Sequence, residues 1–472
     1  MKNYTLQRFK YMFWDVIAAG MSYSILYILR RVVLDMESIP FELSTSFFTG
    51  TYFLGLFFVA AFWLTMYVIT GFYRDIFRRS RLKEFIYTFN ASLLGSIFIF
   101  FALILDDWVS NYTDYYRGFL IYFGSHFLIT SFFRFLLSTA TSNRIRKGKI
   151  TFNSVLIGSN DKAAELYNEI GNKTSTGNRF VGFVSVHNNI RFLVEKNLEH
   201  LGTHTQLPEI IERHDIDEVI IAIESSEHEK LETIINILED TNVKVKMIPD
   251  TYDIISGKVK LESISSAPLI EINHELMPMW QKVIKRVFDV FVSGLLLILL
   301  SPLFCFSAIM VRFSSKGSIF FTQPRLGQYG REFRMIKFRS MYEDAEKNGP
   351  QLSSEEDERI TPWGRIMRKY RLDELPQFIN VVLGEMSIVG PRPERAYYID
   401  RIKVKAPHYK HIQKVKPGIT SWGMVKYGYA ENVDEMVQRL KYDIIYIENM
   451  NLFNDLKILI YTVLIVLQGR GK

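Results

Sequence analysis

The chain has 472 residues, of which 48% are apolar and 14% aromatic, and its formal net charge is +7 at pH 7. This length exceeds one ordinary domain and predicts two or three. A single cysteine, Cys305, excludes an intrachain disulfide framework and a thiolate metal site. The modest positive charge fits a membrane surface, nucleic acid or a phosphorylated substrate equally well, so its distribution along the chain is more informative than its total.

Four apolar stretches occupy the first third of the chain, at residues 11–29, 48–70, 85–105 and 118–140. Each is long enough to cross a bilayer, for which about 20 residues are needed. The first stretch contains Asp15 and is not followed by a small-residue cleavage site, so we expect a retained helix and not a signal peptide.

The charges between these stretches predict their orientation. Cations gather in the loop 71–84 and after the fourth stretch: Arg74, Arg78, Arg79, Arg81, Lys83, Arg144, Arg146, Lys147 and Lys149. Acidic residues mark the two other loops: Asp35, Glu37, Glu42, Asp106, Asp107 and Asp114. Because cytoplasmic loops are enriched in Lys and Arg, the cationic loops are expected inside. Asp15 and Arg134 lie in cytoplasmic turns, from which we expect their side chains to reach the interface without a transport role.

Residues 150–270 show alternating strand and helix patterns. We predict strands at 153–158, 180–185, 219–223 and 243–248, with helices at 161–170, 206–214 and 226–240. This order predicts a Rossmann-like α/β domain with a parallel sheet. The first turn, from Gly158 to Asp161, lacks the G-x-G-x-x-G spacing, which favours a structural or regulatory module over nucleotide binding.

An apolar segment at 287–313 is interrupted by Ser301 and Pro302. One interpretation is a fifth transmembrane helix. Cations lie on both flanks, however, which favours two cytoplasmic ends. Proline removes a helical hydrogen bond and bends the chain, so we favour a re-entrant helix that enters and returns on one face of the membrane.

Two polar motifs follow this segment. Gly327 and Gly330, after Gln323-Pro324-Arg325, predict a turn between paired strands. In the second motif Lys337 and Arg339 alternate with other residues, so both cations would project from one strand face, where they could hold phosphates. For two cations alone, a solvated strand face is the simpler explanation.

The segment 361–391 contains the adjacent carboxylates Asp373 and Glu374 among Arg365, Arg368 and Arg371. Such a group is either an ion-pair network or an active site. A turn with two prolines follows and presents Arg392, whose restricted backbone suits a fixed phosphate contact.

In this order the motifs resemble the polyprenyl-phosphate glycosyl-1-phosphate transferases of the large monotopic type. The resemblance is carried by Lys285-Arg286-Val287-Phe288-Asp289, Ser301-Pro302, Lys337-Phe338-Arg339-Ser340-Met341, Leu372-Asp373-Glu374-Leu375-Pro376-Gln377, Ser387-Ile388-Val389-Gly390-Pro391-Arg392-Pro393 and Lys416-Pro417-Gly418-Ile419-Thr420. Four initial helices and a Rossmann-like middle are also similar to larger members, so the resemblance covers nearly the whole chain.

The resemblance implies a ping-pong reaction with a UDP-sugar and undecaprenyl phosphate as substrates. Asp373 would attack the sugar-bearing phosphate, release UMP and hold a phosphosugar that the polyprenyl phosphate then accepts. Mg²⁺ is the implied cofactor, held by Asp373 or Glu374 together with substrate oxygens. The implied phosphate-binding residues are Lys337, Arg339, Arg368 and Arg392.

The implied architecture is a four-helix transmembrane bundle at 1–149, the Rossmann-like domain at 150–270, and an α/β monotopic catalytic domain at 275–472. Within the last, 287–313 would be re-entrant, and 452–467 either an interfacial helix or a packed core helix. The expected location is the bacterial inner membrane, with the catalytic domain on its cytoplasmic face. The bilayer is the expected partner, no nucleic acid is expected, and assembly into a homo-oligomer stays open.

The sugar is less defined than the reaction. Where the family usually has glycine and then Trp-Ala-Gln, this chain has Ser421, Trp422, Gly423 and Met424. Glucose-1-phosphate is the first expectation, with galactose or an N-acetylated or deoxy sugar as alternatives; the product would start exopolysaccharide, capsule or O-antigen synthesis. A non-enzymatic membrane scaffold that senses a nucleotide is the competing hypothesis, and it leaves the ordered motifs unexplained.

Overall fold

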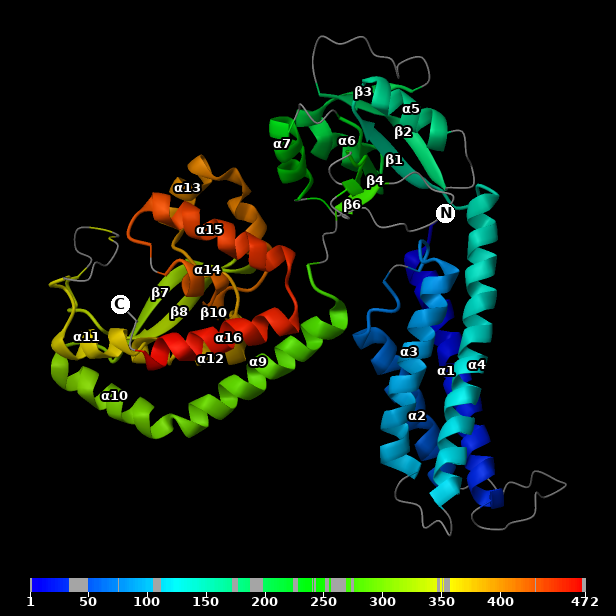
Figure 1. Ribbon diagram of the computed structural model, residues 1–472, viewed down its shortest axis with the longest axis horizontal. Helices are drawn as coiled ribbons and strands as arrows, with labels where there is room; N and C mark the ends of the chain where they lie inside the picture. Colours follow the sequence, from blue (N-terminus) through cyan, green and yellow to red (C-terminus); the bar gives the residue numbers. More distant parts are fainter. Residues whose placement is uncertain are drawn as a thin grey trace. The chain divides into compact units, whose positions relative to one another are not determined.

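A computed structural model describes residues 2–33, 50–74, 76–104, 112–171, 177–186, 198–223, 228–239, 241, 243–250, 254–255, 269–272, 276–345, 349, 351, 357–428 and 430–468. The chain divides into two compact units. The first contains residues 1–231 and 242–272, and the second contains 232–241 and 273–472. Each unit is drawn in Figure 1.

The four predicted apolar helices of the first unit are confirmed. Their bounds are α1 Tyr4–Val33, α2 Gly50–Ile69, α3 Arg81–Ile99 and α4 Tyr112–Arg146, with a π-helical turn η1 at Phe100–Ile104. All four are long and apolar enough to cross a membrane. They lie alongside one another as a bundle (Figure 1). The acidic positions expected in the outer loops lie outside the described residues, except Asp114.

The position of Asp15 and Arg134 corrects the prediction that both side chains reach the interface. Asp15 is 2% and Arg134 1% exposed. Arg134 donates to both Asp15 carboxylate oxygens at 2.9 Å, and the Tyr73 hydroxyl donates to Asp15 Oδ2 at 2.7 Å. The remaining Arg134 nitrogen donates to Thr88 at 2.9 Å. The local sequence gives no sign of this pairing, because the two residues lie 119 positions apart.

The α/β part has one six-stranded sheet in the order β3-β2-β1-β4-β5-β6. Its elements are β1 Phe152–Ile157, α5 Asp161–Ile170, β2 Asn178–Ser185, β3 His200–Thr203, η3 His204–Gln206, α6 Leu207–Arg213, β4 Glu218–Ile221, α7 His228–Leu238, β5 Lys244–Met247 and β6 Ile270–Ile272. The four predicted strands and three predicted helices are confirmed. Two short strands were missed, and the pairing of one of them, β6, is antiparallel to β5.

The cationic residues of the first unit also serve its α/β part. Arg78, in the loop between α2 and α3, forms an ion pair with Glu218, which is fully buried at the start of β4. The Arg78 guanidinium lies 4.1 Å from the ring centroid of Phe152, and Lys2 pairs with Asp217. The amino ends of β1 and β4 therefore contact the basic segments of the bundle.

In the second unit, the apolar segment 287–313 is divided between two helices. Helix α9 spans Met279–Leu299 and α10 spans Ser301–Ser314, and their axes bend by 64° at the break. Pro302 lies in the first turn of α10, where its missing N–H has no helical partner to lose. The two helices form a V along one side of this unit (Figure 1).

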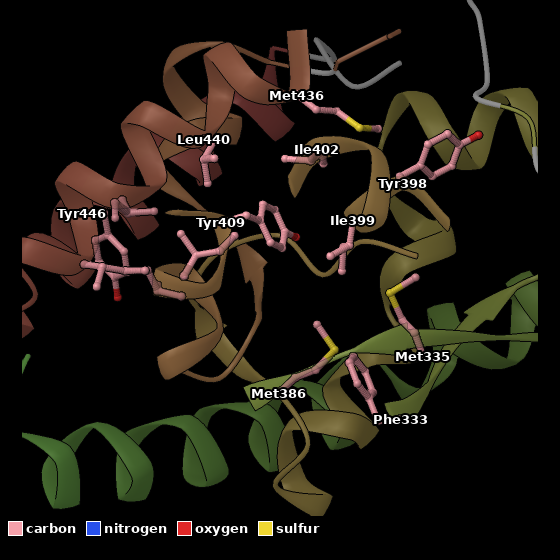
Figure 2. Packing of buried hydrophobic residues seen from close by; sticks show 14 of the residues in the cluster. Phe333, Met335, Met386, Tyr398, Ile399, Ile402, Tyr409, Met436, Leu440 and Tyr446 are labelled. Atoms are coloured by element: carbon pink, nitrogen blue, oxygen red, sulfur yellow. The ribbon is translucent and has the colours of Figure 1, made fainter. Parts of the chain in front are cut away.

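The rest of the second unit is built from short elements. They are β7 Phe320–Leu326, η5 Gln328–Gly330, β8 Glu332–Phe338, α11 Pro362–Lys369, η6 Leu372–Glu374, α12 Gln377–Leu383, β9 Ser387–Val389, α13 Ala396–Lys405, η7 Pro407–Lys414, β10 Gly418–Thr420, α14 Trp422–Lys426, α15 Val433–Glu448 and α16 Leu452–Leu467. Strands β7 and β8 form the predicted antiparallel hairpin, and β9 pairs with β10 in parallel. Figure 2 shows the hydrophobic core of this unit, in which Met436, Leu440 and Tyr446 of α15 point toward residues of α13 and η7.

Candidate active site

Strand β8 brings Lys337 to the acidic pair. The Lys337 ammonium donates to Glu374 Oε1 at 3.0 Å and its side chain is 18% exposed. Arg339, just beyond the strand, instead donates to the Ser315 carbonyl at 2.8 Å and is 7% exposed. Within the described residues no hydrogen bond or ion pair joins Arg339 to either carboxylate, so the two cations expected on one face have different surroundings.

The acidic pair lies in a tight turn between two helices. Thr361 caps α11 by accepting from the Gly364 amide at 3.0 Å. After α11, Arg371 adopts a left-handed backbone with φ 56°, a sparsely populated conformation for a residue with a side chain. Residues Leu372–Glu374 then form one 3₁₀ turn before α12 begins. The left-handed residue reverses the chain and places both carboxylates inside, with Asp373 7% and Glu374 5% exposed.

Helix α12 fixes this turn to β8. The buried amide of Asn380 accepts from Ile336 N at 3.0 Å and donates to the Arg334 carbonyl at 2.9 Å. Arg368, at the end of α11, donates to the Ser340 hydroxyl at 3.0 Å. The turn is thereby held to the strand that supplies Lys337 and to the residue that follows Arg339.

Three cations converge on Glu374. Besides Lys337, Arg371 lies 3.4 Å from Oε2 and Arg392 lies 3.5 Å from Oε1. In the described part of the chain, no cation lies within ion-pair distance of Asp373. The cationic charge is therefore centred on one carboxylate, and the second stands beside it.

The two carboxylates have pKa values shifted in opposite directions. Burial raises the pKa of Asp373, an effect that the charges of Lys337, Arg368 and Arg371 reduce and that of Glu374 increases. Burial alone would also raise the pKa of Glu374, but Lys337, Arg392 and Arg371 hold it well below its ordinary value. Glu374 is thus the more acidic group of the pair, and Asp373 is the more basic one.

The turn at 390–394 holds Arg392 from both sides. The Pro391 carbonyl accepts from Gly418 N at 2.9 Å, and the Pro393 carbonyl accepts from Arg325 at 3.1 Å. Glu394, 6% exposed, pairs with Arg325 at 3.2 Å and with Arg439 at 2.5 Å. Burial alone would raise its pKa, but Arg439, Arg325 and Arg392 lower it.

Helix α9 is bound to the same region through the motif at 285–289. Lys285 donates to the Val389 carbonyl at 3.0 Å and pairs with Asp455 at 2.6 Å. Arg286 donates to the Val381 and Val382 carbonyls at 2.7 and 3.0 Å, which caps the C-terminus of α12. Asp289 accepts from the Ser387 hydroxyl at 2.7 Å. Lys285 and Arg286, two of the cations that precede the apolar segment 287–313, therefore bind groups of the same unit.

The outward faces of three helices are apolar. On α9 and α10, Phe291 is 68%, Ile298 75% and Phe313 83% exposed. On α16, Phe453 is 65% and Val463 57% exposed. The opposite side of α16 is packed, with Asp455 6% and Ile458 2% exposed, so one side of this helix belongs to the core and the other is exposed and apolar.

The side chains of the site can be compared with those that magnesium requires as ligands. Among the described residues no group of three or more His, Cys, Asp or Glu side chains could hold a metal ion. Magnesium nevertheless binds through one or two carboxylates together with phosphate oxygens. Both Glu374 oxygens face cations, whereas no cation of the described residues pairs with Asp373. The residues therefore fit an ion held by Asp373 and substrate oxygens better than one held by both carboxylates.

Sequence reasoning missed the supports of this site. Arg371 was seen among the arginines but not as a partner of Glu374. Arg439 and Asp443 carried one readable signal, since they occupy positions on the apolar face of α15, together with Met436, Leu440 and Ile447. Charged residues at core positions of an amphipathic helix require buried partners.

This geometry defines a class of protein: one with a buried carboxylate pair, an excess of cations and two apolar helices, bent by 64° at their junction, bound to the same core. Residues 280–469 match the family described as bacterial sugar transferase, and residues 68–249 match a CoA-binding domain. The chain is 38% identical over 183 residues to the UDP-glucose:undecaprenyl-phosphate glucose-1-phosphate transferase of Caulobacter vibrioides, covering 38% of this chain and 68% of that protein. The chain belongs to the bacterial sugar transferase family, which confirms the resemblance found in the sequence.

Two longer relatives carry different sugars in their names. The UDP-N-acetylgalactosamine-undecaprenyl-phosphate N-acetylgalactosaminephosphotransferase of Aeromonas hydrophila is 36% identical over 48% of this chain and 52% of its own length. The UDP-glucose:undecaprenyl-phosphate glucose-1-phosphate transferase of Escherichia coli (strain K12) is 33% identical over 56% of this chain and 57% of its own. The chain thus matches little more than half of each.

Proposed function

We propose that this protein transfers a sugar-1-phosphate from a UDP-sugar to undecaprenyl phosphate at the cytoplasmic face of a bacterial inner membrane. The observation that carries the proposal is the buried pair Asp373 and Glu374, on which Lys337, Arg368, Arg371 and Arg392 act together. Four cations beside two carboxylates leave positive charge for a diphosphate. The names of the relatives support the same reaction class.

In the first step, an Asp373 carboxylate oxygen forms a bond to the sugar-bearing phosphorus. The bond from that phosphorus to the bridging oxygen breaks, and UMP leaves with the electron pair. The raised pKa of Asp373 makes its ionised form a stronger nucleophile than an ordinary carboxylate. Glu374 stays ionised and holds Lys337, Arg371 and Arg392 in place beside the transferring group.

In the second step, an oxygen of the polyprenyl phosphate bonds to the same phosphorus, and the bond to Asp373 breaks. The cations now stabilise a second diphosphate, so one group of residues serves both halves of the reaction. Magnesium, held by Asp373 with substrate oxygens, would supply further neutralisation of phosphate charge when bound. Arg339 is proposed as a further phosphate-binding residue from the family pattern.

The apolar hairpin supports a place for this chemistry at the membrane. We propose that α9 and α10 enter and leave one leaflet, with the break at Ser301 and Pro302 at the deepest point, and that α16 lies in the interface. Residues 1–149 would span the membrane, 150–270 form the Rossmann-like domain and 275–472 the catalytic domain. Lys285, Arg286 and Asp289 would then fix the catalytic residues to the hairpin.

Glucose-1-phosphate is the proposed cargo, since the relatives from Caulobacter vibrioides and Escherichia coli are named for it. The N-acetylgalactosamine name of the Aeromonas relative keeps an N-acetylated sugar as the alternative. A series of UDP-sugars, each scored for UMP release, separates the two.

The test of the reaction is UMP release by membranes containing the protein, supplied with a UDP-sugar and undecaprenyl phosphate. Asp373→Asn is expected to abolish release and the covalent labelling of the protein by a sugar-phosphate. Release at the wild-type rate would show that another residue is the nucleophile.

The hairpin is tested by cysteine labelling. Cys305 is exposed on α10, so it is first replaced by alanine, and single cysteines are then introduced as Lys282→Cys and Lys316→Cys. A re-entrant hairpin predicts that an impermeant thiol reagent labels both from the cytoplasmic side only. Labelling of Lys316→Cys from outside would instead indicate a spanning helix.

A further inference from the structure

We propose that helix α15 positions Arg392: Arg439 and Asp443, one turn apart on it, hold the two loops that fix the Arg392 guanidinium against Glu374. The inference rests on the proposed function for its kinetic consequences. Both would be positioning residues for phosphate binding, because neither faces Asp373 or Glu374 directly among the contacts of the described residues.

The first loop is the turn 390–394. Arg439 is 5% exposed and donates to Glu394 Oε1 at 2.5 Å, while Arg325 holds the other Glu394 oxygen at 3.2 Å. The Glu394 backbone carbonyl also accepts from Leu326 N at 3.2 Å. The residue two positions after Arg392 is therefore fixed by both its side chain and its backbone.

The second loop is the segment 421–424. Asp443, 3% exposed, accepts from the Gly423 amide at 3.0 Å. A Cβ on Gly423 would lie 2.8 Å from Asp443 Oδ1 and from Arg439 Cγ, so only glycine allows the loop to approach α15 this closely. The next residue, Met424, accepts from Arg392 Nη1 through its sulfur at 3.5 Å.

Arg392 thus lies between two loops that depend on one helix face. The helix itself is fixed by Met436, Leu440 and Tyr446, which are 3–4% exposed and packed in the core of Figure 2. Because a guanidinium binds phosphate best with its two nitrogens in register, its orientation matters as much as its charge. The departure of residues 421–424 from the family pattern places a methionine at this contact, which links that segment to the phosphate site.

The kinetic test uses the KM for UDP-sugar in the UMP-release assay. Arg439→Gln is expected to raise KM about tenfold, whereas Lys441→Gln, which removes the same charge from the exposed face of α15, leaves it unchanged. Arg439→Lys, which keeps a donor to Glu394, should recover part of the loss. In an Arg392→Gln background, Arg439→Gln should add less than about twofold, because its effect acts through Arg392.

An equal factor in both backgrounds would overturn the inference. So would a lowered thermal unfolding temperature in Arg439→Gln with no change in KM. If the wild type releases no UMP, the proposed function fails, and hydrogen exchange then tests the positioning without catalysis. Asp443→Ala should speed exchange at the Gly423 amide and Arg439→Gln at the Leu326 amide; unchanged exchange at both would refute the role of α15.

Discussion

Two clusters of charged residues, one in each unit, differ in how their charges are balanced. In the helical bundle, the Arg134 guanidinium is matched by Asp15, Thr88 and the rings of Phe72 and Tyr67, whose centroids lie 3.6 and 4.1 Å away. In the second unit, four cations act on the two carboxylates Asp373 and Glu374. In the first cluster the positive and negative charges are equal in number, whereas the second cluster has more cations than carboxylates.

The difference indicates separate roles. A matched pair in which each guanidinium nitrogen donates a hydrogen bond fixes helix positions and leaves no excess charge for an incoming ligand. An excess of partly buried cations is costly unless an anion joins it, and a diphosphate is such an anion. We therefore expect mutations in the first cluster to affect folding and mutations in the second to affect turnover.

The largest expected effect is that of Glu374→Gln. The variant leaves Lys337, Arg371 and Arg392 without their shared carboxylate, so their mutual repulsion should displace them. We expect UMP release to fall about 10³-fold, equivalent to about 4 kcal/mol in transition-state stabilisation. Steady-state assays of detergent-purified protein would measure it, and Glu374→Asp should retain more activity than Glu374→Gln. Full activity in Glu374→Gln would contradict the inference that the second cluster serves turnover.

Arg134→Gln should act on stability instead. Removing one partner of a buried ion pair costs about 3 kcal/mol or more, because the other charge is left uncompensated. We expect a lower unfolding temperature in detergent and unchanged UMP release per folded molecule. Arg117→Gln on the same helix is the control, since the Arg117 side chain is 73% exposed. An Asp15→Leu, Arg134→Leu double variant should recover most of the lost stability; further loss would show that the pair does more than hold helices.

Arg392→Lys sharpens the distinction within the second cluster. Lysine keeps the charge but cannot offer two parallel N–H groups to a phosphate. The KM for UDP-sugar should rise about tenfold while the unfolding temperature stays within experimental error. An unchanged KM would mean that charge alone, and not orientation, is what Arg392 supplies.

The smallest expected effect concerns pH. Burial raises the pKa of Asp443 to about 6, above its value in the unfolded chain, so the folded state retains a proton that the unfolded state has lost. The resulting stabilisation is complete below about pH 4 and is lost as pH rises through 6. Asparagine does not titrate, so Asp443→Asn should gain about 1 kcal/mol relative to wild type between pH 5 and 7.5. Denaturant unfolding of both proteins at pH 5 and pH 7.5 would measure this gain. A difference in free energy of unfolding that is the same at both pH values would contradict a raised pKa of Asp443.

Much of the fold was readable because its signals are local. The apolar stretches, the strand and helix alternation and the helix break at Ser301 and Pro302 each depend on neighbouring residues. The missed strands β3 and β6 have four and three residues, and both lie at the edges of the sheet. Short edge strands bury little surface and show no clear alternation.

The site was readable as a set of motifs but not as a geometry. Lys337 and Arg339 look equivalent in sequence, yet one contacts Glu374 and the other the Ser315 carbonyl. Asp15 and Arg134 looked like interfacial charges, because nothing local indicates a partner 119 residues away. Pairings of this kind depend on the tertiary fold, which decides which charges meet.

The bonds from Lys285, Arg286 and Asp289 to the catalytic core have a mechanical consequence. They join α9 to β9 and to the end of α12, so in the proposed mechanism they would hold Asp373 at a fixed distance from the helix break. If α9 and α10 are inserted in one leaflet as proposed, the active site would meet the phosphate group of the lipid substrate at a fixed distance from the centre of the membrane. Bilayer thickness would then become a variable of the reaction rate, alongside substrate concentration.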